Sequence, residues 1–523
     1  MGWVERVECV LNKHIRIIGV IIAVCGFAIR VYYASKYYLN PDEAAHYTLA
    51  AHPWHGLVGL YHNATLIMHP PLFIALLQPA LLLGHSEVLL RLVPAICGAL
   101  FPWFVMLWVQ GIAGSGAAIC AQVLLTFSPN LIGLGAEVRA YTLAFLFLSV
   151  CLLFLEKSLE SGSTPSMIWF SVFLYLAVLS EYAVAWFVAA MGIYAILRLW
   201  QRPASGRLFL VWAVGQLVAV GLYLFLYKTQ IAGFSSHRKF GEIYTTWLRP
   251  DFPEPHQNIL RFAAHGTMGQ FRYMFQLQVL IWAAAAASLF AIYYLWRRKS
   301  PSYAILMVLP FCFACLSAIF HLFPYGPSRH TAILDIAIAA TVGIAIAELA
   351  RHRLLPIVAA APPCVLIWVF LCTHSYGFQD PNAIAPSKHQ VQDMREAAAF
   401  LQKSVPADAL ILTDTGTDLM LGYYLGCPAF EYWDSSETHR VDQCGSLRFV
   451  IDPSFEFGGL GDIRDALAQI HAEYGSDRQV WIAAGGFDGG DSAANSVSKA
   501  RAFGKAISIY QESELQPLSA TNP

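Results

Sequence analysis

The chain has 523 residues, of which 57% are hydrophobic and only 13% are charged, and its formal net charge is −1. Soluble proteins carry about 25% charged residues, so this composition excludes a disordered chain, a coiled coil and a nucleic-acid-binding protein, and it argues against a wholly soluble enzyme. The 14 Trp and 24 Tyr residues suit the aromatic belts at the two surfaces of a membrane. The sequence therefore predicts an integral membrane protein.

Apolar runs recur along the first 372 residues of the chain. A membrane span needs about 20 mostly apolar residues. The first run has basic residues before it and no small-residue cleavage site after it, so we expect a retained span and not a cleaved signal peptide. In chain order, we expect about eleven spans at residues 15–34, 91–110, 117–135, 142–155, 167–180, 183–200, 207–227, 277–296, 302–323, 331–350 and 354–372.

The Lys and Arg residues of the short connectors predict the orientation. If the N-terminus is cytoplasmic, every strongly basic short connector lies inside, with the residues Lys157, Arg198, Arg202, Arg207, Arg297, Arg298, Lys299, Arg351 and Arg353. This agreement requires that segment 70–84, which is apolar but short and interrupted by Pro79, is an interfacial or re-entrant helix. The C-terminus is then outside.

This topology predicts two domains. Residues 1–372 form a transmembrane module with large outer loops at 35–90 and 228–276, and residues 373–523 form an extracytoplasmic α/β domain. The second domain alternates helix-like stretches with short strand-like runs and glycine-rich turns. It also contains Cys427 and Cys444, which either form a disulfide or remain separate thiols.

Charged residues gather on the predicted outer face. The first loop contains Asp42 and Glu43 after Asn40-Pro41, a typical helix start. Stabilisation of the helix dipole would explain this acidic pair without any function, but its place directly after the first span puts it at the membrane surface.

Further along the chain, His69 precedes the interfacial segment, and Glu137 and Arg139 stand just before Tyr141 at the outer end of span 117–135. A surface histidine and a local Glu–Arg ion pair are the structural alternatives. Each of these groups reaches the same membrane face as Asp42, because the topology places them there.

Three more sites lie on this face. Glu181 and Tyr182 end a short span, where an ionisable residue is a functional candidate or a simple helix-end polar pair. The loop 228–276 contains His237 and Arg238, which could anchor the loop to anionic lipid. Arg329 stands at the mouth of span 331–350, where its guanidinium could bind a phosphate through two hydrogen bonds or contact lipid headgroups.

These residues carry a family resemblance. The order and spacing of the motifs resemble the GT-C superfamily of membrane glycosyltransferases, in particular the protein O-mannosyltransferases, lipid A aminoarabinose transferases and bacterial RgtA-type enzymes. The motifs are Asp42-Glu43, His69-Pro70-Pro71-Leu72, Arg91-Leu92-Val93-Pro94-Ala95 with Gly98, and Glu137-Val138-Arg139-Ala140-Tyr141. The resemblance is most specific over about residues 35–160 and implies a GT-C-type polytopic fold.

The resemblance also implies a reaction. A hexosyl- or pentosyltransferase of this kind moves a sugar from a polyprenyl-phosphate or dolichyl-phosphate donor to an acceptor hydroxyl. Asp42 matches the catalytic base of the family, which implies an inverting single displacement. Glu43 and Glu137 would orient the base, the acceptor or the sugar. The donor phosphate would be bound by His69, Arg139, Arg329, His237 and Arg238, and the substrate by Tyr141, Glu181 and Tyr182.

The expected partners are the lipid-linked donor, membrane lipid, and a glycan, lipid or protein acceptor, with no nucleic acid. Relatives that transfer oligosaccharides use Asp-x-Asp motifs with a divalent ion, whereas this chain has Asp42-Glu43. We therefore expect no obligatory cofactor, although a divalent metal is not excluded. The RgtA-type resemblance and compact loops favour a bacterial inner membrane over an endoplasmic reticulum.

Two other functions stay open. A lipid-linked-sugar flippase or secondary transporter would place ionisable residues inside the membrane and repeat its two halves. No such repeat is visible, but Asp335 and Glu348 lie within span 331–350. A receptor or scaffold with an outer binding domain would tolerate the loss of Asp42.

Overall fold

A computed structural model describes residues 3–52, 56–66, 69–201, 206–232, 248–351, 390–427, 440–452, 460–485, 501–504 and 506–515. The chain divides into two compact units. The first unit consists of Met1–Tyr32, Met68–Phe73 and Arg91–Ala383, and the second of Tyr33–Ile67, Ile74–Leu90 and Ile384–Pro523. The sequence predicted a single boundary between residues 372 and 373. The observed division differs, because most of the first outer loop groups with the C-terminal domain.

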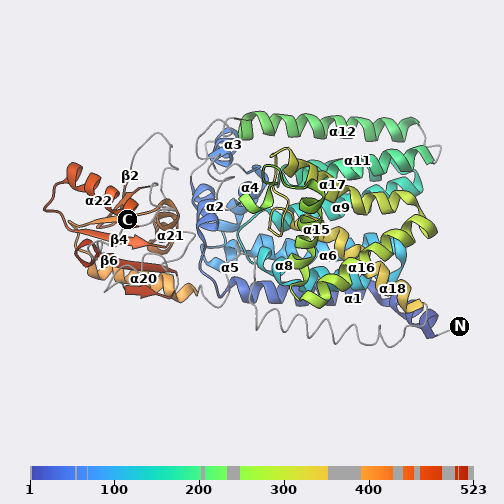
Figure 1. The fold of residues 1–523 in the computed structure, drawn as a ribbon, viewed down its shortest axis with the longest axis horizontal. Helices are drawn as coiled ribbons and strands as arrows, with labels where there is room; N and C mark the ends of the chain where they lie inside the picture. Colours follow the sequence, from blue (N-terminus) through green and yellow to red (C-terminus); the bar gives the residue numbers. More distant parts are fainter. Residues whose placement is uncertain are drawn as a thin grey trace. The chain divides into compact units, whose positions relative to one another are not determined.

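The first unit is helical, and its long helices run along a common direction (Figure 1). Short 3-10 or π segments lie at Tyr227–Ile231, Arg249–Asp251, Leu295–Lys299 and Ala332–Leu334. The α-helices are α1 (Trp3–Ala34), α6 (Leu92–Ala113), α7 (Ser115–Phe127), α8 (Pro129–Leu134), α9 (Tyr141–Ser161), α10 (Thr164–Val178), α11 (Val184–Gln201), α12 (Gly206–Leu226), α15 (Ile259–Phe275), α16 (Gln278–Tyr294), α17 (Pro301–Ile319) and α18 (Asp335–Arg351).

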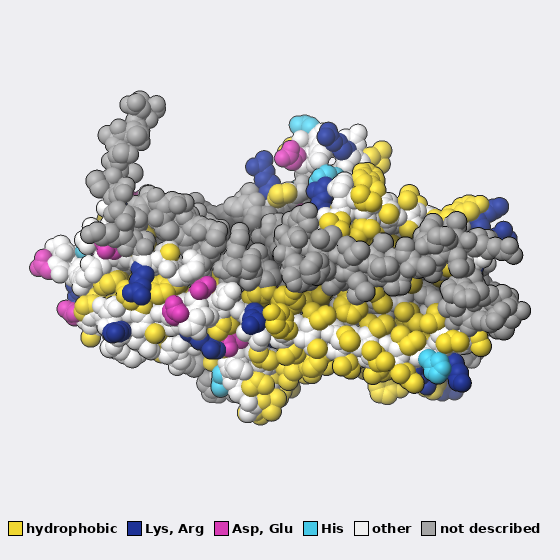
Figure 2. All heavy atoms as spheres, turned by 90° about the horizontal axis from the view of Figure 1, so that it is seen from below, with side chains coloured by type: hydrophobic (Ala, Val, Ile, Leu, Met, Phe, Trp, Pro, Cys, Tyr) yellow, Lys and Arg dark blue, Asp and Glu magenta, His cyan; other side chains and the backbone are white. Residues whose placement is uncertain are grey.

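Eight helices in the described part of the chain are long and apolar enough to cross a membrane. They are Glu8–Ala34, Leu92–Ala113, Tyr141–Ser161, Val184–Gln201, Gly206–Ile231, Gln278–Lys299, Pro301–Ile319 and Ala332–Arg351. Hydrophobic side chains cover much of the visible face of the helical unit (Figure 2), as a lipid-facing surface requires. The prediction of a polytopic helical membrane protein is confirmed.

Some predicted spans differ from the observed helices. Span 167–180 corresponds to α10, which has only 15 residues, and α7 within span 117–135 has 13. Such helices are shorter than the roughly 20 residues that cross a bilayer. The predicted interfacial segment 70–84 contains α4 (Leu72–Leu81), also a short apolar helix. The expected span 354–372 lies outside the described residues.

Span 117–135 is divided because Pro129 begins a new helix, α8. Proline has no backbone N–H and fits the first turn of a helix but not its interior. The end of α7 consequently has backbone carbonyls without intrahelical partners. Arg30 of α1, which is 0% exposed, donates a hydrogen bond to one of them, the Thr126 carbonyl, at 3.2 Å. It also donates to the carbonyl of Leu131 in α8 at 3.3 Å, which accepts the Gly135 N–H as well. No sequence motif marked this arginine.

Two glycines make room for the Arg30 side chain. A Cβ atom at Gly98 of α6 would lie 2.6 Å from the Arg30 Nε atom, and a Cβ at Gly135 would also overlap the arginine. Any larger residue at either position must displace the guanidinium. The glycines thus allow α1, α6 and the end of α8 to pack around one buried cation.

The second unit contains helices and a six-stranded sheet with the order β2-β3-β1-β4-β6-β5, in which β1, β3 and β4 are parallel (Figure 1). The predicted C-terminal α/β domain is therefore confirmed. The helices are α2 (Pro41–Ala51), α3 (Gly56–Leu66), most of α4, α5 (Glu87–Leu90), α20 (Val391–Ser404), α21 (Thr415–Leu425) and α22 (Leu460–Tyr474). The strands are β1 (Leu410–Thr413), β2 (Arg440–Cys444), β3 (Leu447–Ile451), β4 (Val480–Ala484), β5 (Arg501–Phe503) and β6 (Ile507–Gln511), and a 3-10 turn follows at Glu512–Glu514.

The sheet has a hydrophobic cluster on each face, because successive strand residues point to opposite sides. Leu410 and Leu412 of β1 pack with residues of α22, whereas Ile411 packs with residues of α20 and α21. Tyr38 and Ala44 from the first outer loop belong to the cluster that contains Ile411. The outer loop therefore completes the core of the C-terminal domain.

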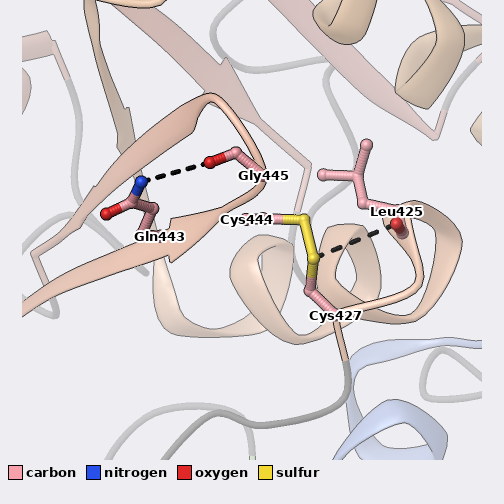
Figure 3. Close-up of a disulfide and its surroundings, with 5 residues drawn as sticks. All are labelled: Leu425, Cys427, Gln443, Cys444 and Gly445. Carbon is pink, nitrogen blue, oxygen red and sulfur yellow. Dashed lines mark hydrogen bonds between the residues drawn. A yellow bond between two sulfur atoms is a disulfide. The ribbon is translucent and has the colours of Figure 1, made fainter.

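The structure joins Cys427 and Cys444 in a disulfide, the alternative that the sequence left open (Figure 3). Cys427 follows α21 and Cys444 ends β2, and their Cα atoms are 5.8 Å apart. The bond links a helix to the edge strand of the sheet. By contrast, Cys312 and Cys315 of α17 are free thiols.

The packing of Arg30 generates a first prediction. Gly98→Ala should lower the thermal stability of the full chain by at least several degrees, because the added methyl overlaps Arg30 and a buried cation without its acceptors is costly. Gly111→Ala is the matched control, since it lies on the same helix and its Cβ would meet no atom within 4 Å. Thermal unfolding in detergent measures both. Equal unfolding temperatures for the two variants would contradict the packing argument.

The C-terminal domain generates a second prediction, about pH. Burial raises the pKa of Asp418 well above its usual range, as do the nearby carboxylates Asp442 and Asp414, against the opposing charge of Arg440. The folded state therefore holds a proton that the unfolded chain releases above about pH 4, and stability falls as pH rises from there toward the folded-state pKa.

Asp418→Asn should therefore slow hydrogen–deuterium exchange in β1 and α21 relative to the parent at pH 8, with a smaller effect near pH 4. Asp408→Asn, at an exposed position of the same domain, is the control and should change neither. Faster exchange in Asp418→Asn at pH 8 would show that the charged carboxylate stabilises the domain.

Candidate active site

In the first unit, the segment after α8 buries an arginine beside a tyrosine. Arg139 is 4% exposed, and its Nη2 atom lies 3.4 Å from the Tyr141 hydroxyl, to which it donates. The guanidinium carbon is 5.5 Å from the centroid of the Tyr141 ring, within the range of a cation–π contact. The half-buried Glu137 accepts a hydrogen bond through its backbone carbonyl from the Arg139 N–H.

The connection between α10 and α11 places a buried carboxylate near this arginine. Glu181 accepts a hydrogen bond from the Tyr182 backbone N–H at 3.0 Å, and the Tyr182 hydroxyl donates to the Gln230 side chain. Burial raises the pKa of Glu181, whereas the charges of Arg139 and Arg329 and two backbone N–H groups lower it. Glu181 thus lies within electrostatic range of two arginines.

Arg329 reaches the same region from the segment before α18. Gln270 of α15 donates to the Gly326 carbonyl and the Thr331 hydroxyl on either side of Arg329, and the Tyr325 N–H donates to the Asp251 carbonyl at 2.9 Å. Arg329 is buried and interacts electrostatically with Tyr141. The hydrogen bonds from α15 therefore hold the loop that presents the guanidinium.

His330 is a site residue that the sequence analysis missed. Its ring centroid is 6.2 Å from that of Tyr141 and 6.0 Å from that of Phe323, with edge-to-face geometry in both cases. The adjacent Arg329 was the only local signal, and the approach to Tyr141 spans 189 positions of the sequence (330 minus 141).

The turn before α4 lies near the same connection. The Leu72 N–H donates to the Leu179 carbonyl at 3.1 Å, so the residues after His69 lie beside the residues before Glu181. Within the first unit, the structure thus brings together Arg139, Tyr141, Glu181 and Arg329, with Tyr182 bonded to Glu181. Two buried guanidinium groups in one region are an arrangement that can bind an anion such as a phosphate. Predicted residues His237 and Arg238 lie outside the described residues.

In the second unit, Asp42 and Glu43 start α2 but differ in environment. The Asn40 side chain accepts a hydrogen bond from the Glu43 N–H at 2.9 Å, and the Glu43 carboxylate accepts one from the Asn40 N–H at 3.0 Å. This capping box satisfies two backbone N–H donors, and it engages the carboxylate of the buried Glu43 in a hydrogen bond. Asp42 is only partly buried. The accessible carboxylate of the pair is therefore Asp42.

In the described part of the chain, no group of three or more His, Cys, Asp and Glu side chains could hold a metal ion. The expectation that no metal is obligatory stays a prediction.

Comparisons with known proteins agree with this architecture. Residues 68–226 match the model of the dolichyl-phosphate-mannose-protein mannosyltransferase family. The structure of ArnT from Cupriavidus metallidurans bound to undecaprenyl phosphate has a TM-score of 0.55 and 12% identity, over 95% of this chain and 99% of that one. Its apo structure gives the same TM-score and identity, over 95% and 98%.

An oligosaccharyltransferase from Archaeoglobus fulgidus in the apo form has a TM-score of 0.46 and 12% identity, over 89% of this chain and 69% of that one. No curated protein sequence matches the chain. The fold and the family match define a class: this is an integral membrane protein with the fold of the GT-C glycosyltransferases. The resemblance that the sequence motifs indicated is confirmed.

The capping box predicts how Glu43 variants behave. Glu43→Gln should keep turnover within about threefold of the parent, because glutamine can also accept the Asn40 N–H. Glu43→Ala should destabilise α2, because the Asn40 N–H loses its acceptor, and should speed hydrogen–deuterium exchange over residues 41–51. A hundredfold loss of turnover in Glu43→Gln would instead assign the carboxylate a chemical role.

Proposed function

We propose that this protein is an inverting glycosyltransferase that moves a sugar from a polyprenyl-phosphate donor to an acceptor hydroxyl on the extracytoplasmic side of a bacterial inner membrane. The observation that carries the proposal is the pair of buried arginines, Arg139 and Arg329, around Tyr141 and Glu181 in the membrane unit. An undecaprenyl phosphate is bound in a structure of the same fold, ArnT, which supports a phosphate as the anion.

The reaction needs a base, a charge acceptor and a lipid-facing site. Asp42 would take the proton of the acceptor hydroxyl as its oxygen attacks the anomeric carbon of the sugar. The bond from that carbon to the phosphate oxygen breaks, and the lipid phosphate leaves with the electron pair. A single displacement of this kind inverts the anomeric configuration.

The arginines would act on the leaving group. Negative charge grows on the phosphate as the glycosidic bond breaks, and guanidinium groups held in a buried site stabilise that charge more strongly than water-exposed ones. His69 and the residues His237 and Arg238 are proposed further phosphate contacts. Tyr141, Glu181 and Tyr182 are proposed to bind substrate, and Glu137 to orient the sugar or acceptor.

The alternative is a flippase or transporter, and one observation favours it. Asp335 in the membrane helix α18 is fully buried, and neither of its carboxylate oxygens has a hydrogen-bond partner among the described residues. Ionisable residues inside the membrane often mark a transport path. In that case Asp335→Asn would abolish function and Asp42→Asn would not.

The test of the base is turnover of a polyprenyl-phosphate sugar in reconstituted membranes. Asp42→Asn should reduce the rate by at least about a hundredfold, the contribution of a general base, while the folded fraction stays at the parent level. Unchanged turnover would remove Asp42 from the mechanism.

The phosphate site has its own test. Arg329→Gln should weaken binding of undecaprenyl phosphate by roughly ten- to a hundredfold, because a charge-assisted hydrogen bond contributes about 1.5–3 kcal/mol. Arg272→Gln is the control, since Arg272 lies exposed on α15. Equal affinities of the two variants would place the phosphate elsewhere.

A further inference from the structure

The helix that carries Asp42 is anchored in the α/β domain. Ala44 of α2 is fully buried in the cluster that contains residues of α20, α21 and the sheet. Pro41, directly before Asp42, packs on α21, where a Cβ atom at Gly416 would lie 3.2 Å from the proline ring. The start of α2 therefore rests against the start of α21.

Backbone hydrogen bonds hold the chain that leads into α2. The Leu39 N–H donates to the hydroxyl of Tyr424 in α21 at 3.1 Å, and Leu39 is 0% exposed. The Val391 N–H, at the start of α20, donates to the Lys36 carbonyl at 3.1 Å. Leu39 directly precedes Asn40, the residue that caps α2. Tyr424 therefore bonds to the residue directly before the Asn40 cap of α2.

An aromatic contact and hydrogen bonds hold α2 further along its length. The Tyr47 ring meets the Tyr423 ring edge-to-face at 4.9 Å, and the Tyr47 hydroxyl lies 3.2 Å from His85 Nδ1. The Tyr423 hydroxyl donates to the His85 carbonyl at 2.5 Å. Asp42 lies three residues after Leu39 and five before Tyr47, between two attachments to α21.

A second link joins the outer loop to α20. Arg395 donates to both carboxylate oxygens of Glu87 in α5, at 3.0 and 3.1 Å. The contact is separate from the bond between Leu39 and Tyr424, so the two links can be broken independently.

The attachments matter because α2 has only 11 residues. Isolated helices shorter than about 12–15 residues are marginal in water, and a misplacement of about 1 Å can cost a reaction about a hundredfold in rate. We propose that the C-terminal α/β domain positions the catalytic base, with Tyr424 as a positioning residue that acts through Leu39 and the cap of α2. This inference rests on the proposed function of Asp42.

The test compares Tyr424→Phe with Tyr510→Phe in the full chain. Tyr510 is a buried tyrosine of the same domain whose hydroxyl has no hydrogen-bond partner among the described residues. Tyr424→Phe should lower kcat about tenfold with an unchanged KM for the lipid-linked donor, and it should speed hydrogen–deuterium exchange over residues 39–47. Tyr510→Phe should change none of these.

Identical kcat and exchange in the two variants would overturn the inference. The exchange measurement needs no activity, so it judges the attachment even if Asp42→Asn proves active and the proposed base is wrong. A normal exchange rate in Tyr424→Phe beside an inactive Asp42→Asn would refute the positioning role alone.

If Tyr424→Phe fails to fold, the link through Arg395 replaces it. Arg395→Ala should lower kcat several-fold and speed exchange over residues 39–47, and Arg395→Lys, which keeps the charge opposite Glu87, should recover most of both. Arg395→Ala with parent-like kcat and exchange would contradict the inference.

Discussion

One buried guanidinium joins α1 to both sides of the break between α7 and α8. Pro129 ends the continuous span that hydropathy predicts, and the carbonyls of Thr126 and Leu131 accept hydrogen bonds from Arg30 of α1. A backbone break inside a membrane is tolerated only where protein groups satisfy the freed carbonyls. The arginine requires a close approach of Gly98 and Gly135, so the break, the cation and the two glycines depend on one another.

This arrangement explains where the candidate phosphate site begins. The chain leaves α8 at Gly135 beside Arg30 and buries Arg139 four residues later, next to Tyr141. Glu181 and Arg329 then approach from the α10–α11 connection and from the loop that Gln270 holds. The site is built from connections between helices, where backbone geometry is free to present side chains, while the helices supply a rigid frame.

In the second unit, the first outer loop packs with a different domain from the one expected. From the sequence, we expected the first outer loop to belong to the transmembrane module, and no pattern specified a role for the C-terminal domain. In the structure, Tyr38 and Ala44 belong to the hydrophobic core of that domain. A domain that completes its core with the loop carrying Asp42 is part of the proposed catalytic apparatus, even if it never touches a substrate.

Composition and local pattern determined much by themselves. Several features follow from residues that are close together in the sequence, because hydrophobic burial and capping act over one or two turns. They are the membrane class, most spans, the α/β domain, the helix start at Asn40-Pro41, and the neighbouring pair Arg139 and Tyr141. Tertiary structure decided the rest. The bonds of Arg30 join residues 96 and 101 positions apart, and the bond between Leu39 and Tyr424 joins residues 385 apart. No local pattern specifies such partners, since they depend on which helices pack side by side, and that choice is made by the whole chain.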